Sequence, residues 1–206
     1  TGLPDYNLMT AGPLNIFYLK KKVLFPHCTV TVKMRESKHT LSLSQGNQII
    51  VFSIRNFTDL LFIKKRISTL AEITSIEKED NLIRFQLKGI KRVRVTSLRR
   101  FFEARYTEIP ENPAQQDPAL TKELRKKAQE LIFLINVEES DRLIDLMNFL
   151  VDLGQITDFI SNYFVLDDSM RNDLLNETDI SARSRLLQQK IQQIIEKIGK
   201  QGQTNV

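Results

Sequence analysis

Short segments of alternating apolar and polar residues occupy the first half of the chain. Residues 29–32, 82–87 and 93–95 alternate with period two, and residues 48–54 form a continuous apolar run. Alternation sends one set of side chains toward a core and the other toward water, as in a half-buried antiparallel strand. The triplet at 79–81 predicts a hairpin turn between two strands. Several short strands with few helical signals predict a closed or nearly closed sheet.

A change of pattern separates this half from the next. Pro110, Pro113 and Pro118 cluster among polar residues, so a linker is predicted at about 110–117. We therefore expect two domains, residues 1–112 and residues 113–206. Within the first, residues 37–44 fit either a short helix or an extended segment.

After the linker the apolar residues recur with helical spacing. Asp117 followed by Pro118 predicts a helix start. Gly154 is expected to end the second helix in a left-handed conformation, and Asp167 to Ser169 to open a short helix. Asp179 is expected to cap a long final helix. The expected buried faces are Leu120, Leu124, Leu131 and Ile135; Leu143, Met147, Leu150 and Val151; Ile156, Phe159, Ile160 and Tyr163; Leu174 and Leu175; and Leu187, Ile191, Ile194 and Ile198. This half is predicted to be a bundle of four or five helices, which makes the whole chain α+β.

Composition narrows the class of protein. The chain has 206 residues and a net charge of +5, divided into +9 over residues 1–112 and −4 over residues 113–206. The single Cys28 rules out an intramolecular disulfide and agrees with a reducing cytoplasm or with any compartment that does not need disulfides. No apolar run approaches the roughly 20 residues of a membrane span, and the first residues lack the features of a signal peptide. We expect a soluble, cytoplasmic protein without a membrane partner.

The sequence shows no catalytic, cofactor or metal constellation. A phosphate-binding loop needs glycine five residues before its Gly-Lys pair, but Ile194 stands there before Gly199-Lys200. His27, Cys28 and His39 lack metal-ligand spacing, so a buried cysteine and ordinary histidines are expected. Nothing marks Cys28 as an activated nucleophile paired with histidine. No catalytic, cofactor or metal residues are therefore predicted.

A run of basic residues is the strongest other functional signal. Its cations, with Phe101 and Phe102 beside them, fit a surface that contacts phosphates and stacks bases. On alternating strands the same cations form a solvated face, which we favour and which predicts that Arg92 and Arg94 are exposed. The run comprises Arg84, Lys88, Lys91, Arg92, Arg94, Arg99, Arg100 and Arg105.

Three segments together carry a family resemblance. They are residues 14–26, ending in Val23-Leu24-Phe25-Pro26; residues 87–95, with Leu87-Lys88-Gly89-Ile90-Lys91-Arg92-Val93; and residues 101–106. They resemble the amino-terminal substrate-recognition domain of the ATP-dependent Lon protease family. The resemblance implies a pseudo-barrel similar to RNA-binding PUA domains, followed by a helical subdomain that ends in a long helix. A residue without Cβ at Gly89 fits a turn or bulge between two strands.

The resemblance also implies a function. The chain would capture unfolded or damaged proteins for a Lon-type serine endopeptidase, and would itself be non-catalytic. ATP and Mg²⁺ would bind only to other modules of the parent protein, which is expected to be a homo-oligomer. The alternatives are a free-standing Lon-domain adaptor and a PUA-like nucleic-acid-binding module. The sequence identifies no substrate-binding residues.

Overall fold

The computed structural model describes residues 13–99, 102–112, 116–135 and 140–203. They form two compact units, one extending to Pro110 and one starting at Glu111. Among the described residues, no helix combines the length and the apolar character that crossing a bilayer requires.

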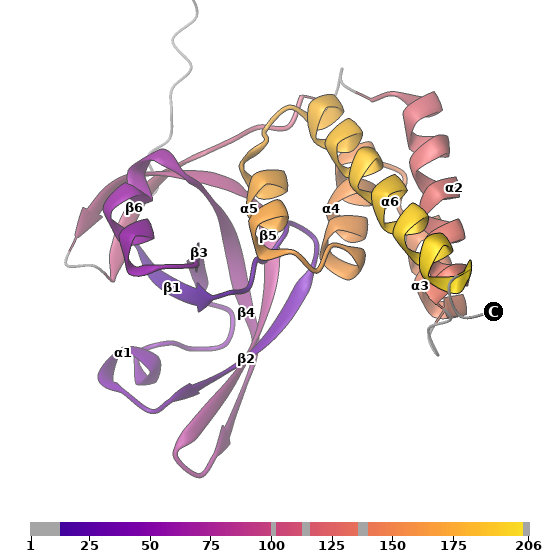
Figure 1. The fold of residues 1–206 in the computed structure, drawn as a ribbon. Helices are drawn as coiled ribbons and strands as arrows, with labels where there is room; N and C mark the ends of the chain where they lie inside the picture. The colour runs from indigo at the N-terminus through magenta and orange to yellow at the C-terminus, as the bar shows by residue number, and fades with distance from the viewer. Residues whose placement is uncertain (1–12, 100–101, 113–115, 136–139, 204–206) are drawn as a thin grey trace, which may run out of the picture. The chain divides into compact units, whose positions relative to one another are not determined.

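The first unit is a closed barrel with one strand attached (Figure 1). Its sheet order is β2-β5-β4-β3-β1-β6, and a further β5–β6 pairing closes five strands into a ring. All pairings are antiparallel except the parallel pair β1–β3. The strands are β1 (Leu14–Lys20), β2 (Thr29–Arg35), β3 (Gln48–Ile54), β4 (Ile67–Glu79), β5 (Leu82–Arg99) and β6 (Glu103–Glu108), with helix α1 (Lys38–Leu41) and 3₁₀ helix η1 (Phe57–Lys65) between them. The expectation of a closed sheet is confirmed.

Strand β5 forms two different ladders in one continuous run. Its first half pairs with β2 and its second half with β6, while β4 follows most of its length. Ala71 pairs with Gly89 but Leu70 pairs with Lys91, so Ile90 is the extra residue of a β-bulge. The bulge lies just after the part of β5 that pairs with β2, where the strand continues into the barrel wall. The expected hairpin turn is confirmed between β4 and β5, where Asp80 has a φ of 49°.

Gly89 lies inside this strand next to the bulged Ile90, so of the two expectations for it, a turn or a bulge, the structure has the bulge. The chain crosses β5 here: the His27 amide donates to the Gly89 carbonyl at 2.9 Å, and the Gly89 amide donates to the Cys28 carbonyl at 2.9 Å. A Cβ atom at Gly89 would lie 2.2 Å from the Phe25 carbonyl oxygen. Glycine is therefore needed for a close backbone approach.

Both faces of the sheet are covered near this crossing. Inside the barrel, Ile16, Ile50, Phe52, Ile63, Leu70, Val93, Val95, Ala104 and Tyr106 form one apolar cluster. Outside it, Phe17 packs edge-on against Phe85, and the Thr69 hydroxyl donates to the Leu24 carbonyl at 2.6 Å. Thr69 pairs with Arg92, whose side chain is only 1% exposed. The expectation that Arg92 is solvated is therefore wrong, because the segment around Leu24 covers the second face.

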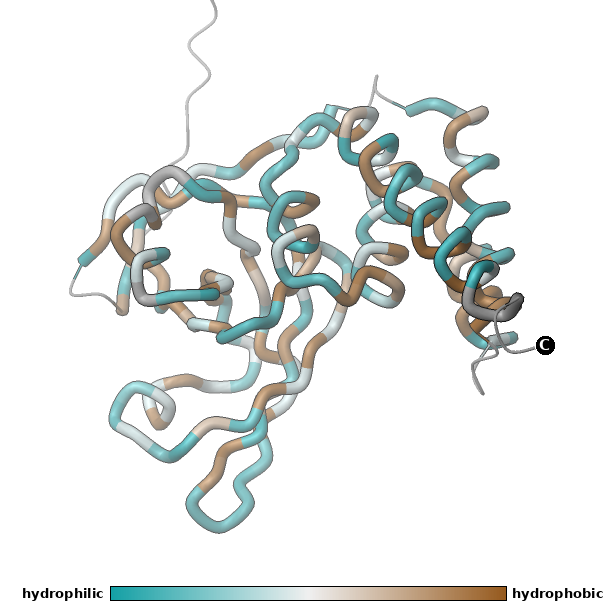
Figure 2. Tube along the Cα trace, viewed as in Figure 1, coloured by the Kyte–Doolittle hydropathy of each residue, from teal (hydrophilic) through white to brown (hydrophobic). Residues whose placement is uncertain are grey.

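The second unit contains five helices among its described residues (Figure 1). The predicted caps are confirmed: Asp117, Asp167 and Asp179 each accept a backbone hydrogen bond in the first turn of the following helix. The helices are α2 (Pro118–Ile135), α3 (Ser140–Phe149), α4 (Leu153–Phe164), α5 (Asp168–Asn176) and α6 (Ile180–Gln203). Figure 2 shows hydrophobic and hydrophilic residues alternating along α6 as its period requires.

Most of the predicted apolar faces are buried, with a few corrections. Ile135, the last residue of α2, and Val151, which follows the end of α3 at Phe149, are exposed. Tyr163 on α4 is also exposed, and Leu150 is half-buried. Ile194 and Ile198 are only half-buried. The buried members are Leu120, Leu124, Leu131, Leu143, Met147, Ile156, Phe159, Ile160, Leu174, Leu175, Leu187 and Ile191.

Gly154 does not end a helix, contrary to the prediction. It lies in the first turn of α4, whose cap Asp152 accepts from the Gln155 amide at 3.0 Å. A Cβ atom here would lie 2.6 Å from Glu111 Oε2 and 3.3 Å from Arg183 Nη2. Gly154 therefore leaves room for a buried ion pair.

That ion pair is centred on Arg183, which is fully buried. Its guanidinium lies 2.8 Å from Glu111 Oε1 and 3.4 Å from Asp158 Oδ1, and it donates to the Glu177 carbonyl at 3.0 Å. Three segments of the second unit thus meet at one cation, which compensates the charge of buried Asp158.

Candidate functional site

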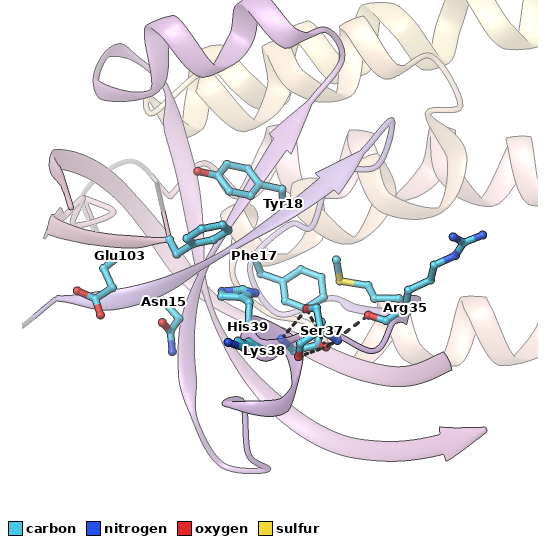
Figure 3. Close-up of a pocket in the computed structure, with 11 residues that line it drawn as sticks. Asn15, Phe17, Tyr18, Arg35, Ser37, Lys38, His39 and Glu103 are labelled. Atoms are coloured by element: carbon cyan, nitrogen blue, oxygen red, sulfur yellow. Dashed lines mark hydrogen bonds between the residues drawn. The ribbon is translucent and has the colours of Figure 1, made fainter. Parts of the chain in front are cut away.

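The candidate site is a groove on the first unit (Figure 3). It has a volume of about 960 Å³, within the range of ligand sites. Four pieces of chain line it: β1, the end of β2, the segment of α1, and the start of β6. The lining residues are Asn15, Phe17, Tyr18, Met34, Arg35, Ser37, Lys38, His39, Thr40, Phe102 and Glu103.

A capping box positions the residues of α1. The Thr40 amide donates to Ser37 Oγ at 3.1 Å, and the Ser37 amide donates to Thr40 Oγ1 at 2.8 Å. This reciprocal pair holds Lys38 and His39 between its two ends, beside the groove. Of the two conformations open for residues 37–44, the structure has the short helix over Lys38–Leu41.

Aromatic rings form the centre of the groove. The ring centroids of His39 and Phe102 lie 5.0 Å apart at an interplanar angle of 35°. The Ile16 amide donates to the Phe102 carbonyl at 2.7 Å, which fixes this end of the chain to β1. Phe102 is nevertheless 51% exposed. An apolar ring whose backbone is hydrogen-bonded to β1 and which is open to solvent is suited to contact a ligand.

Burial perturbs two titratable groups in the groove. It lowers the pKa of His39, because the imidazolium loses hydration there. Burial raises the pKa of Tyr18, because the charged phenolate would also lose hydration there. His39 is thus neutral near pH 7, and its Nε2 atom is buried without a hydrogen-bond partner among the described residues.

Ionisable groups lie around the aromatic rings. Arg35 and Lys38 are exposed cations, and Glu103 is a half-buried carboxylate. In Figure 3, Glu103 and Arg35 lie at opposite ends of the lining residues. The arrangement offers apolar contact at its centre and opposite charges at its ends.

The histidines and the cysteine weighed in the sequence do not form one site. Cys28 is buried as a free thiol, and His27 is exposed with a φ of 63°. Only His39 lines the groove. Across the described ranges, no three His, Cys, Asp or Glu side chains gather as metal ligands would. Gly199 and Lys200 lie within helix α6 rather than in a loop.

The basic run is divided by the fold. Arg84 pairs with Glu79 at 2.6 Å and Lys91 with Glu108 at 2.9 Å, while Arg92 is buried. Lys88, Arg94, Arg99 and Arg105 remain exposed on β5 and β6, whereas Arg100 and Phe101 lie outside the described residues. The neighbouring strands supply acidic partners that the linear run does not contain, so these cations do not form one uniform basic face.

The sequence did not identify the residues that line the groove as a site. Tyr18 belongs to the first family-like segment, but Arg35 and Lys38 carry no motif. The available signal was the Ser37-to-Thr40 spacing at a helix start, which places Lys38 and His39 on a short helix.

Comparisons with known proteins show which family profile and which solved structures the chain resembles. The profile of the ATP-dependent protease La (LON) substrate-binding domain matches residues 13–193. The fold is similar to the N-terminal domain of the Mycobacterium avium complex Lon protease, with a TM-score of 0.66 and 16% identity over 88% of this chain and 98% of that one. It is also similar to a Lon N-terminal domain protein from Xanthomonas campestris, with a TM-score of 0.55 and 18% identity over 86% and 97% of the two chains. Among curated proteins, none matches significantly.

Proposed function

The chain belongs to the family of ATP-dependent protease La (LON) substrate-binding domains, and on this premise we propose that it is the substrate-recognition region of a Lon-type, ATP-dependent serine protease. Its role is to hold unfolded or damaged proteins in the cytoplasm for degradation. ATP, Mg²⁺ and the peptidase nucleophile belong to other modules of that protease.

The groove is the observation that carries this proposal. Unfolded proteins differ from native ones chiefly by exposed apolar segments. The half-exposed Phe102, with His39 and Tyr18 nearby, offers such segments an apolar surface held on a rigid barrel. The backbone hydrogen bond of Ile16 to Phe102 keeps the surface in place without a ligand.

Affinity for one groove is expected to be weak. A few apolar side chains contribute roughly 1.5–3 kcal/mol each, and association entropy opposes them. We therefore propose that the parent is a homo-oligomer whose several copies raise the effective concentration of grooves. The apolar seam of α6, with Ile194 and Ile198 half-buried, is a candidate for that association.

Binding to an unfolded client tests the proposal. Reduced, carboxamidomethylated lactalbumin should bind the purified chain with micromolar affinity, and native lactalbumin should not. Phe102→Ser should weaken binding at least several-fold. Leu61→Ser is the control, since Leu61 is 74% exposed on η1, away from the groove-lining residues. Equal binding of native and unfolded lactalbumin, or none of either, would refute substrate recognition.

A second measurement concerns catalysis. The purified chain should neither hydrolyse ATP nor cleave unfolded lactalbumin. Turnover that disappears on substituting a residue of this chain would show that it has an active site of its own.

A further inference from the structure

Two cations beside the groove differ from their neighbours. Between β2 and the end of β4, Lys33 pairs with Glu79 at 2.8 Å, and Lys78 of β4 pairs with Glu36, the residue after β2, at 3.0 Å. Arg35 and Lys38 have no carboxylate within ion-pair distance among the described residues. Glu36 lies between them in sequence, yet it is engaged by Lys78. Lys33 and Lys78 are thus neutralised within the fold, whereas Arg35 and Lys38, which line the groove, are available to a ligand.

The groove does not neutralise them either. Its only carboxylate among the lining residues, Glu103, lies at the end opposite Arg35 in Figure 3. The capping box places Lys38 on the first turn of α1, among the residues that line the groove. A ligand entering the groove therefore meets apolar rings and a positive charge together.

From this arrangement we propose that the groove selects peptide segments in which a large apolar or aromatic residue adjoins acidic residues. The apolar side chain packs against Phe102 and Tyr18, and the carboxylates face Arg35 and Lys38. This inference rests on the proposed function and adds a charge preference to it.

The expected preference is moderate. Exposed ion pairs contribute little, and charge complementarity acts mainly on specificity. An acidic-aromatic peptide should bind about three- to tenfold more tightly than a basic-aromatic peptide of the same length. Raising the salt concentration should reduce this ratio, because mobile ions screen exposed charges.

Three fluorescein-labelled peptides test the preference by fluorescence anisotropy. One has phenylalanines flanked by glutamates, the second has lysines in place of the glutamates, and the third has serines in place of the phenylalanines. The first should bind best, the third worst. In the double variant Arg35→Ser/Lys38→Ser, the first two should bind equally. Equal affinities for the first two in the wild type, or an unchanged ratio in the double variant, would overturn the proposal.

A matched double variant controls for net charge. Lys88→Ser/Arg94→Ser removes two exposed cations of the same unit that do not line the groove, so it should keep the preference. Loss of the preference in this control as well would assign it to overall charge and overturn the proposal. Thermal unfolding of both variants should match the wild type, which shows that the groove is intact.

The same measurements separate this inference from the proposed function. If unfolded lactalbumin binds but the peptides show no charge preference, substrate recognition stands and the preference fails. If neither lactalbumin nor any peptide binds, both fail. A labelled RNA oligomer is the last probe. If it binds more tightly than the acidic-aromatic peptide, and if this binding is lost in Arg35→Ser/Lys38→Ser, the groove is a nucleic-acid site instead.

Discussion

The two units each bury an arginine, and they do so in different ways. Arg183 precedes Leu187 by one helical repeat and Ile191 by two, so the three share the buried face of α6. Arg92 adjoins Val93 on β5, and both are buried although their side chains point to opposite faces. The helical spacing of apolar residues on α6 is therefore enough to predict that Arg183 is buried. Alternation along β5 does not predict that Arg92 is buried, because a segment distant in sequence covers the second face of the sheet.

Charge reversal at Arg92 should have the largest effect. A carboxylate at this fully buried position should destabilise the chain by more than the roughly 3–5 kcal/mol that follows when a buried charge loses its partner. Arg94→Glu, on an exposed side chain two residues away, should change stability by less than about 0.5 kcal/mol. Urea unfolding followed by circular dichroism measures both. If Arg92→Glu does not fold, Arg92→Met should fold with a smaller loss of stability. Equal stability of the Arg92 and Arg94 variants would contradict the burial of Arg92.

Removing the buried cation of the helical unit comes next. Arg183→Met leaves Asp158 buried without its compensating charge and should cost about 3–5 kcal/mol. Arg185→Met on the exposed face of α6 is the control and should be nearly neutral. Stability is again read from urea unfolding. Replacing Asp158 with Asn in the Arg183→Met background should recover part of the loss; no recovery would mean that Arg183 acts through packing alone.

The chain crossing at Gly89 is the next test of the barrel. Gly89→Ala should destabilise by about 3 kcal/mol, since the new Cβ meets backbone that cannot rotate away. The matched substitution is Gly199→Ala in α6, which has open space around the Cβ position and should be neutral or slightly stabilising. A thermal shift that is equal for the two alanine variants would contradict the close approach of Phe25.

Helix capping provides a smaller, local test of the helical unit. Asp179→Ala removes the acceptor for the Ala182 amide and should cost about 1 kcal/mol. Asp173→Ala, on an exposed residue within α5, has no cap to lose and serves as the comparison. Chemical denaturation resolves a difference of this size, and an equal cost for both would mean that the cap contributes nothing.

The smallest expected effect is a pH dependence of the barrel. Burial lowers the pKa of His39 in the folded state below the value of 6.5 for the free side chain, so the unfolded chain takes up this proton first. Stability should therefore fall as the pH drops from 6.5 through the folded pKa, and His39→Gln should remove that part of the decline. The pKa of Asp59 is also lowered: burial raises it, but amide hydrogen bonds from Arg55 and Asn56 and the charge of Arg66 outweigh that effect. Its contribution is lost only below about pH 4, so the two groups titrate in separate ranges. An identical profile for His39→Gln between pH 7 and 5 would contradict this assignment.

Local signals predicted the helical unit more completely than the barrel. Caps at Asp117, Asp167 and Asp179 need only neighbouring residues, and all three are observed. The place of Gly154 was mistaken because its role depends on Glu111, which is distant in sequence. In the barrel, the alternation predicted individual strands but not the crossing over Gly89 or the parallel β1–β3 pair, since both join segments far apart along the chain.

The groove was harder still to predict. Its walls come from β1, the end of β2, α1 and β6, and no single segment of the sequence contains more than part of it. Phe102 carried a signal as part of a family-like segment, whereas Arg35 and Lys38 stand out only when the ion pairs of their neighbours are known. Pairing preferences between exposed charges depend on three-dimensional proximity, which periodicity alone does not specify.

Barrel closure has a consequence for how the chain is made. Strand β6 is the last strand to be synthesised, and it pairs with both β1 and the second half of β5. Until it emerges, those two strands present open hydrogen-bonding edges, which recruit other chains. Joining residues so far apart also carries a high loop-closure entropy, so this step should be slow compared with formation of the locally capped helices. Aggregation during synthesis should therefore be governed by β6, and a chain truncated before Glu103 should be insoluble even though most of its barrel is present.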